Sequence, residues 1–174
     1  MLILQLTGLP GAGKTTLSQR VKEQLRIQGR SIAVLDGDVL RKTVNRDLGF
    51  SKADRQENIR RLGALAHSML AENEIVIIAA ISPFDEIRKE LEKKFGVKTI
   101  WIHCSLPTLI KRDPKGLYRR AMLPNDHPDK IFNLTGIDGV YEEPENPHLL
   151  IDTEKHSIED ASNLLVQFIL ERVQ

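Results

Sequence analysis

The chain reads Gly8-Leu9-Pro10-Gly11-Ala12-Gly13-Lys14-Thr15-Thr16, one residue after the apolar run Leu2–Leu6. The three glycines of this stretch let backbone N–H groups turn inward and surround phosphate oxygens. We expect Lys14 to reach the β- and γ-phosphates of a nucleoside triphosphate and the Thr15 hydroxyl to ligate Mg²⁺. The motif needs a strand before it and a helix after it, and the apolar periodicity predicts both. The stretch therefore predicts a phosphate-binding P-loop over residues 8–16.

The P-loop by itself does not separate a kinase from a GTPase, an ATPase or a passive nucleotide sensor. GTPases normally have an Asn-Lys-x-Asp element that recognises guanine, and the sequence contains no such tetrapeptide. This argues against a GTP-dependent switch. The leading interpretation is an ATP-dependent phosphotransferase, and a non-catalytic nucleotide-binding module is the alternative from another class.

The apolar pattern along the rest of the chain predicts an α/β fold. Helical patterns alternate with short apolar runs, and capping boxes at Ser51 with Asp54 and at Ser157 with Asp160 begin two of the helices. Such alternation predicts a three-layer P-loop, nucleotide-kinase-like fold with a five-stranded parallel sheet. The predicted strands are Leu2–Leu6, Ile32–Leu35, Ile75–Ala80, Thr99–Ile102 and Leu149–Ile151.

Length and composition limit the classes to which the protein can belong. Its 174 residues suit one domain, residues 1–174, with a single sizeable core. Lysine and arginine (25) nearly balance aspartate and glutamate (24), so we expect neither a nucleic-acid partner nor a membrane surface. One cysteine, Cys104, fits a reducing compartment, and the opening apolar run is too short for a signal peptide. We therefore expect a cytoplasmic protein that holds anionic ligands with locally placed cations.

Two carboxylates, Asp36 and Asp38, follow the predicted strand Ile32–Leu35. In open α/β sheets, ligands bind at the carboxyl ends of the strands. A carboxylate there can hold Mg²⁺ or accept a proton from an attacking hydroxyl. Asp-Gly is also a common turn dipeptide, but a turn accounts for one aspartate better than for two. The pair therefore favours a functional role over a purely structural one.

Arginines are concentrated after these carboxylates, among them Arg41 and Arg55. Arg55 and Asn58 are spaced i, i+3 and so project from one face of a predicted helix. Guanidinium groups bind phosphate or sulfate oxygens through paired N–H donors, although a solvated helix face accounts for some of these arginines. Phe50, in the turn before the helix, is a candidate to stack on a nucleobase, with plain packing as an equal alternative.

The segment Leu123–Pro147 has no clear periodicity and contains four prolines. Loops of this length in a small domain are usually functional or mobile. We interpret the segment as part of a lid or substrate loop beside the nucleotide site, with a flexible insertion as the alternative.

Together these residues make the chain resemble the adenylylsulfate (APS) kinase family. The resemblance implies an ATP- and Mg²⁺-dependent kinase that phosphorylates the 3′-hydroxyl of adenosine 5′-phosphosulfate (APS) to give PAPS, in sulfate activation. It also implies a lid around residues 112–147 and, because family members are often dimers, a homodimer. The matching blocks are Gly8–Thr16 (GLPGAGKTT), Leu35–Arg41 (LDGDVLR), Leu48–Arg61 (LGFSKADRQENIRR), Ile81–Pro83 (ISP), Arg112–Tyr118 (RDPKGLY) and Thr135–Pro147 (TGIDGVYEEPENP).

The resemblance implies roles for the residues in these blocks. Asp38 corresponds to the residue that activates the 3′-hydroxyl or positions Mg²⁺, and Lys115 to a lid lysine that neutralises transferring charge. Ile81 and Ser82 match a pair that lines the substrate site. A phosphoserine intermediate at Ser82 is one view of the family, although in-line transfer needs only positioning and charge neutralisation. The implied substrate contacts also include Asp36, Arg41, Phe50, Arg55 and Asn58.

The chain departs from the family pattern at three points. Leu2 begins the first strand without the usual preceding stretch, and Pro10 replaces a serine and so contributes no N–H to the P-loop. Leu134 stands where the family has a second phenylalanine that stacks on adenine, and Phe132 is another source of that ring. This departure leaves open a related P-loop kinase that acts on another small nucleotide conjugate or an alcohol.

Overall fold

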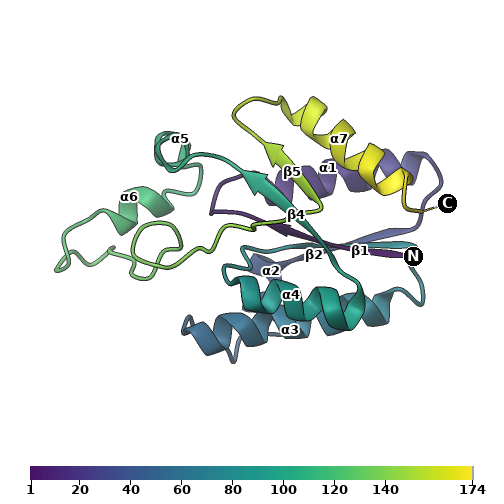
Figure 1. Ribbon diagram of the computed structural model, residues 1–174. Coiled ribbons are helices and arrows are strands. Elements are labelled where there is room, and N and C mark those ends of the chain that lie inside the picture. Colours follow the sequence, from purple (N-terminus) through teal and green to yellow (C-terminus); the bar gives the residue numbers. More distant parts are fainter. Residues whose placement is uncertain (174) are drawn as a thin grey trace.

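The computed structural model, shown in Figure 1, describes residues 1–173. Its one sheet has five parallel strands in the order β2-β3-β1-β4-β5. Each strand lies within one residue, at either end, of the range that the sequence predicts. The predicted five-stranded parallel sheet is therefore confirmed. The strands are β1 (Leu2–Thr7), β2 (Ile32–Asp36), β3 (Ile75–Ala79), β4 (Lys98–His103) and β5 (Leu149–Asp152). The helices are α1 (Lys14–Ile27), α2 (Gly37–Lys42), α3 (Lys52–Met69), α4 (Asp85–Phe95), α5 (Leu106–Arg112), α6 (Leu117–Ala121) and α7 (Ile158–Leu170).

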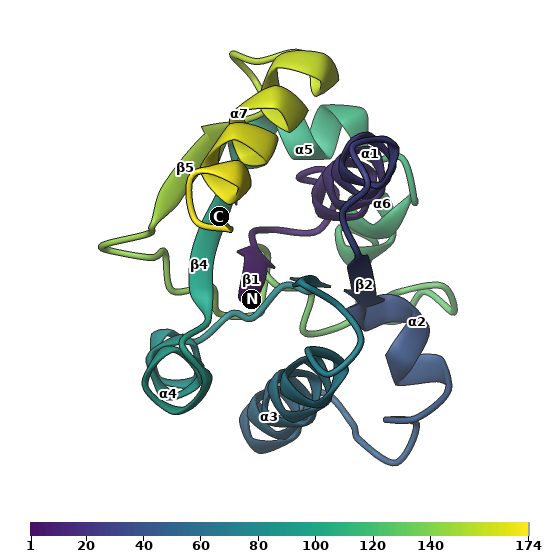
Figure 2. The ribbon, with the colours of Figure 1, turned by 90° about the vertical axis from the view of Figure 1, so that its right-hand side faces the viewer.

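The two faces of the sheet are covered by different helices, which gives the expected three layers. Successive side chains of a strand point to opposite faces. Leu4 of β1 accordingly packs in a cluster with side chains of α1 and α7, whereas Ile3 packs in a second cluster with side chains of α3 and α4. Figure 2 shows α1 and α7 on one side of the strands and α3 and α4 on the other. Both faces are thus buried, as a parallel sheet requires.

Local signals in the sequence set the ends of the helices. The hydroxyl oxygens of Ser51 and Ser157 accept the backbone N–H of Asp54 and Asp160, each at 3.1 Å, so both capping boxes begin their helices as predicted. Gly29 follows the end of α1 with φ 79°, a left-handed conformation that favours glycine. Helix positions therefore follow from neighbouring residues.

All five strands run in one direction, so their carboxyl ends meet at one edge of the sheet. The P-loop, α2, α5 and α6 lie at this edge, together with the segment that leads to β5 (Figure 1). Between residues 123 and 147 the chain forms no helix or strand of the sheet, and an isolated bridge joins Thr135 to Gly139. Residues 131–135 of this segment line a cavity together with the P-loop at this edge. Of the helices within residues 1–173, none is both long and apolar enough for a bilayer crossing.

Candidate active site

The P-loop is built by glycines that no other residue could replace without strain. A Cβ atom at Gly8 would lie 2.3 Å from the carbonyl oxygen of Ile102 on the neighbouring strand β4. Gly13 adopts φ 104° at the N-cap of α1, which turns the loop into the helix. The positive N-terminal end of α1 therefore points into the loop, where an anion would bind.

Lys14 is the cation of this loop, and its ammonium group turns back onto the loop itself. Lys14 Nζ donates to the carbonyl oxygens of Gly8 and Leu9, both at 2.8 Å. Desolvation by burial lowers the pKa of Lys14 to about 8, against the opposing charge of Asp38. An arriving phosphate would supply the negative charge that stabilises the protonated ammonium group.

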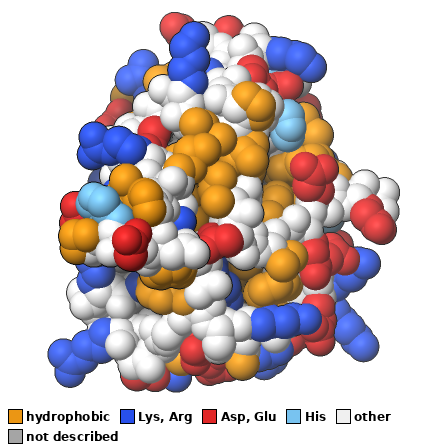
Figure 3. All heavy atoms as spheres, turned by 90° about the vertical axis from the view of Figure 1, so that its left-hand side faces the viewer, with side chains coloured by type: hydrophobic (Ala, Val, Ile, Leu, Met, Phe, Trp, Pro, Cys, Tyr) orange, Lys and Arg blue, Asp and Glu red, His pale blue; other side chains and the backbone are white. Residues whose placement is uncertain are grey.

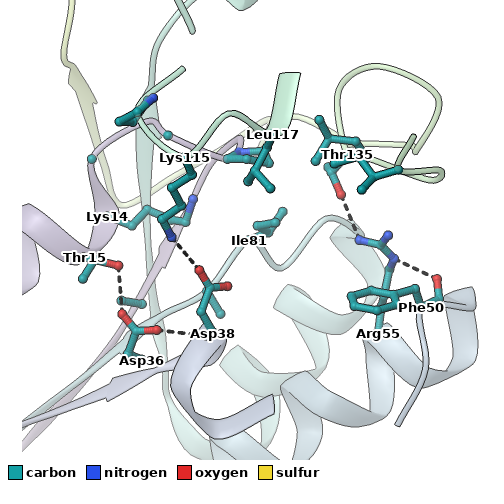
Figure 4. Close-up of a pocket in the computed structure, with 18 of the residues that line it drawn as sticks. Lys14, Thr15, Asp36, Asp38, Phe50, Arg55, Ile81, Lys115, Leu117 and Thr135 are labelled. Carbon is teal, nitrogen blue, oxygen red and sulfur yellow. Dashed lines mark hydrogen bonds and ion pairs between the residues drawn. The ribbon is translucent and has the colours of Figure 1, made fainter. Parts of the chain in front are cut away.

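The two predicted carboxylates make different contacts. Thr15 Oγ1 donates to Asp36 Oδ2 at 2.8 Å, and Asp36 Oδ1 accepts the backbone N–H of Asp38 at 2.9 Å (Figure 4). Asp36 thereby caps α2 and at the same time lies beside the P-loop hydroxyl. Asp38 instead accepts a hydrogen bond from Lys115 Nζ at 2.7 Å. The two aspartates and Thr15 supply carboxylate and hydroxyl oxygens, which are the ligand types of Mg²⁺.

The charge state of Asp38 follows from its surroundings. Burial would raise the pKa of this carboxyl group, but the hydrogen bond from Lys115 and the positive charges of Lys115, Lys14 and Lys42 outweigh it. The pKa of Asp38 therefore lies below its ordinary value. Asp38 is ionised at neutral pH and can accept a proton.

A cavity of about 530 Å³ joins the P-loop to the predicted lid, residues 112–147. The P-loop, the two aspartates and Lys115 line one part of it, and Phe50, Arg55 and Thr135 lie across the space from them (Figure 4). On the surface, this end of the molecule is hollowed, and hydrophobic side chains gather around the hollow (Figure 3). The lining residues that the sequence predicts are Pro10, Gly11, Gly13, Lys14, Thr15, Thr16, Asp36, Asp38, Phe50, Arg55, Ile81, Lys115, Phe132 and Leu134.

Arg55 links the helical side of the cavity to the lid. Its Nε donates to the Phe50 carbonyl oxygen at 2.9 Å, its Nη1 to Thr135 Oγ1 at 2.9 Å, and its Nη2 to the Asn133 carbonyl oxygen at 2.7 Å. The Phe50 ring is 64% exposed, with the guanidinium carbons of Arg55 and Arg41 at 5.5 and 4.9 Å from its centroid. An exposed ring in a cavity is available to stack on a base, which favours the binding interpretation of Phe50 over plain packing.

The structure does not bring every predicted substrate residue to the cavity. Asn58 is buried, and its Oδ1 accepts from Asn45 Nδ2 at 3.0 Å. Arg41 Nη1 donates to the Gly49 carbonyl oxygen at 2.8 Å, and Arg41 does not line the cavity. Ser82 is 1% exposed, and its hydroxyl has no hydrogen-bond partner within residues 1–173. Among the P-loop residues, Gly8, Leu9 and Ala12 form the loop without lining this cavity.

Phe132 and Leu134 both line the cavity, but their environments differ. Leu134 is partly buried and packs against the main hydrophobic cluster beneath the P-loop. The Phe132 ring is 58% exposed and lies 5.6 Å from Lys130 Nζ. Phe132 therefore provides the second aromatic surface of the cavity, while Leu134 anchors the segment that presents it.

Sequence reasoning missed a second cavity, of about 390 Å³, that shares Gly11, Gly13 and Thr16 with the first. Its other walls include Arg112, Thr153 and His156. Thr153 and His156 follow β5, and ligands bind at the carboxyl ends of strands in such sheets, so their position after a predicted strand could have indicated a binding role. The P-loop thus lies between two cavities.

No sequence signal indicated that the predicted lid contacts the P-loop. Tyr118 of α6 is 1% exposed, and its hydroxyl donates to the Pro10 carbonyl oxygen at 2.8 Å. Leu117 and Thr135 also line the first cavity. Both lie within sequence blocks that resemble the family, but neither was predicted as a site residue. The part of the lid around α6 is therefore packed onto the body of the protein.

Known proteins of one family are similar to this chain over most of its length. The family model described as adenylylsulphate kinase matches residues 1–152. An adenylyl-sulfate kinase of Bacillus licheniformis is 43% identical over 99% of this chain and 86% of its own length. A probable adenylyl-sulfate kinase of Bacillus subtilis is 44% identical over 98% of this chain and 86% of its own. Among solved structures, the Mycobacterium tuberculosis APS kinase CysC in complex with AMPPNP and APS superposes with a TM-score of 0.86, at 34% identity and 97% coverage of both chains.

Proposed function

The chain belongs to the adenylylsulphate kinase family, and we propose that the cavity between its P-loop and its lid is where APS is phosphorylated. The protein is an ATP-dependent kinase that transfers the γ-phosphate of ATP to the 3′-hydroxyl of APS and so forms PAPS. The observation that supports this site best is the cavity itself, because the P-loop, two carboxylates, a lid lysine and two exposed aromatic rings line one space.

The two cavities suit two nucleotides bound at once. The Mycobacterium tuberculosis kinase was solved with AMPPNP and APS together. In the present chain, the second cavity, beside Arg112 and His156, would hold the base of ATP. The triphosphate would then lie over the P-loop and point its γ-phosphate into the first cavity, where APS binds. The γ-phosphate and the acceptor hydroxyl would then meet in the first cavity, which is the arrangement that direct transfer needs.

Asp38 and Lys115 are the residues that we assign to the transfer step. The ionised Asp38 carboxylate accepts the proton of the 3′-hydroxyl as the oxygen attacks the γ-phosphorus. The bond from the γ-phosphorus to the bridging oxygen breaks, and ADP leaves with the electron pair. Lys14 and Lys115 contribute positive charge to the phosphate oxygens, because both ammonium groups line the cavity.

Mg²⁺ is part of the proposal. Thr15, Asp36 and Asp38 place hydroxyl and carboxylate oxygens in one cavity, and the Thr15–Asp36 contact of 2.8 Å brings two of them together. Mg²⁺ bound by these groups would supply neutralising charge to the phosphates of ATP. The sequence predicts Thr15 and Asp38 as ligands, and we add Asp36 to the proposal because its Oδ2 lies 2.8 Å from Thr15 Oγ1.

The aromatic rings are proposed to bind the adenine of APS. Phe50 and Phe132 are both exposed and both line the first cavity, so a base can lie against either ring. Arg55, between Phe50 and the lid, has a guanidinium group that suits the oxygens of the acceptor. We propose further that the enzyme works in the cytoplasm, where ATP is supplied, and that it forms a homodimer.

The assay for this function uses purified protein with ATP, MgCl₂ and APS, and the nucleotides are separated by ion-exchange chromatography. We expect ADP and PAPS to form in equal amounts. A well-folded sample that releases ADP without PAPS, or neither product, would contradict the proposal.

A second candidate function follows from Leu134, which replaces the family's aromatic residue and is packed against the core. It is a kinase of the same fold that acts on another nucleotide conjugate or on an alcohol. A panel of acceptors at equal concentration separates the two. The first proposal predicts the highest kcat/KM for APS, and the second predicts it for another member of the panel.

A further inference from the structure

Arg88 is a buried cation that the catalytic scheme does not use. It lies on α4, is only 3% exposed and is therefore unusual, because arginine is rarely buried unless its charge is paired. Within residues 1–173, its one carboxylate contact is Asp85 Oδ1 at 3.2 Å, and Lys89 Nζ shares that carboxylate group at 2.5 Å. Ion pairing alone therefore does not account for the burial of Arg88.

The shortest contacts of Arg88 go to two backbone carbonyls from distant parts of the chain. Nη1 donates to the Ser82 carbonyl oxygen at 2.8 Å, and Nη2 donates to the Glu142 carbonyl oxygen at 2.7 Å. The planar guanidinium group holds its donors in a fixed fork, so it sets the distance between the two carbonyls. Arg88 thus bridges the turn after β3 and the last part of the lid.

The first of these segments forms part of the cavity wall. Ser82 has φ 47°, a left-handed conformation that a non-glycine residue keeps only where its surroundings hold it. Its neighbour Ile81 lines the acceptor cavity. Thr7 Oγ1 donates to the Ile81 carbonyl oxygen at 2.5 Å, so the turn is held from β1 as well as from α4.

The second segment is docked onto the same turn. The Glu142 N–H donates to the Pro83 carbonyl oxygen at 2.8 Å, and Glu142 Oε2 accepts the Asp85 N–H at 2.7 Å at the start of α4. The Tyr141 hydroxyl lies 3.1 Å from Thr7 Oγ1. A few residues upstream, the chain from 131 to 135 lines the cavity opposite the P-loop.

We infer that Arg88 is a positioning residue for the acceptor: it holds the Ile81–Ser82 turn, whose Ile81 lines the cavity, against the lid segment 141–142. Arg88 lines neither of the two cavities and acts through Ile81 and the lid. The inference rests on the proposed function for the identity of the acceptor, APS. Loss of the bridge would loosen the acceptor wall and leave the P-loop glycines and Lys14, which bind ATP, in place.

The test compares Arg88→Met with Arg60→Met in steady-state kinetics against both substrates. Methionine fills similar space and suits a buried site. Arg60 of α3 is a matched control, because it pairs at 2.9 Å, near the surface, with Glu90 of α4, the helix that carries Arg88. We expect Arg88→Met to raise the KM for APS roughly tenfold, the scale of a lost charge-assisted hydrogen bond, with the KM for ATP unchanged. Arg88→Lys, which keeps the charge, should recover part of the loss.

A purely structural role would give a different result. It would lower thermal stability and the amount of active enzyme, while the KM values for APS and ATP stayed the same or rose together; either outcome would overturn the inference. Tyr141→Phe, which removes only a hydroxyl from the same unit, is the second variant if Arg88→Met does not fold. Tyr141→Phe should also raise the KM for APS and leave the KM for ATP unchanged.

Hydrogen exchange separates failure of this inference from failure of the proposed function. If the wild-type protein formed no PAPS, the proposed function would be wrong, and exchange would still test the bridge. We expect Arg88→Lys to increase exchange at residues 81–85 and 139–142 and not in the P-loop, with no such increase in Arg60→Met. Equal exchange in all three proteins would contradict the inference.

Discussion

Lys115 Nζ lies 2.7 Å from Asp38 Oδ2, so the segment between α5 and α6 is joined to the start of α2 across the acceptor cavity. The two residues are 77 positions apart in the sequence and were predicted from separate motifs. Their side chains are 57% and 65% exposed, and such a pair contributes only about 0–1 kcal/mol to stability. The contact therefore serves to position the two side chains. A substrate can break it at little cost in free energy and then contact both charged groups.

Replacement of Asp38 by asparagine tests the proton acceptor. The amide keeps the shape of the side chain but cannot accept the 3′-hydroxyl proton, so we expect kcat to fall by roughly 100-fold or more. The Kd of ATP, measured by calorimetry, should change much less. Asp47→Asn is the control, because Asp47 is an exposed carboxylate that pairs with Arg61 outside the cavity. Unchanged turnover in Asp38→Asn would remove Asp38 from the catalytic step.

ATP binding should take up a proton in alkaline solution, because the pKa of Lys14 is about 8 in the folded protein. Phosphate restores the charged form, so uptake should be small at pH 7 and approach about one proton near pH 9. Calorimetry in two buffers of different ionisation enthalpy measures it. Lys14→Arg, whose guanidinium group stays charged at pH 9, should bind without this uptake. Equal uptake at pH 7 and pH 9 would contradict the assignment.

The same pKa has a consequence for stability. Lys14 titrates at about 8 when folded and at 10.5 in its unperturbed state, so the unfolded chain binds more protons between these values. The contribution of Lys14 to the free energy of unfolding should therefore increase as pH rises from about 8 to 10.5. Urea denaturation of the wild type and Lys14→Met across this range checks the sign, and a smaller pH slope is expected in the variant.

Asn58 should act on stability and not on acceptor binding. Asn58→Ala leaves Asn45 Nδ2 buried without its 3.0 Å acceptor, which should cost about 1–3 kcal/mol in the free energy of unfolding. Urea denaturation measures that loss, and the KM for APS should stay close to the wild-type value. A large rise in KM with unchanged stability would show instead that Asn58 contacts the substrate, as the family resemblance implied.

Ser82→Ala should retain activity. The Ser82 hydroxyl is buried, lies outside the acceptor cavity and has no hydrogen-bond partner in the described part of the chain. We therefore expect kcat to stay within about threefold of the wild-type value, because no hydrogen bond is lost. Mass spectrometry of the wild type after incubation with ATP should find no phosphate on Ser82. A phosphorylated Ser82, with an inactive alanine variant, would support the intermediate.

The sequence predicted most of the fold because the relevant signals are local. Apolar runs set the strands, Ser51 and Ser157 set the starts of two helices, and the P-loop glycines set the turn into α1. Asp36 and Asp38 were predictable in the same way, because residues at the carboxyl end of a predicted strand lie at the edge of the sheet where ligands bind.

Directions of side chains depend on tertiary packing and were harder to predict. Asn58 shares a helical face with Arg55, yet it turns toward Asn45 because that side of α3 is buried. Arg88 stands among charged residues in a pattern typical of a surface helix, and its partners at Ser82 and Glu142 are known only once the lid is folded. Contacts between segments so far apart leave no periodic signal.

The central claim is that phosphate moves from ATP to the 3′-hydroxyl of APS in this cavity, and ³¹P NMR of the reaction mixture tests it most directly. We predict a new 3′-phosphomonoester resonance on a nucleotide that keeps its phosphosulfate group, rising in step with ADP. ADP with inorganic phosphate alone, or phosphate on any other hydroxyl, would contradict the claim.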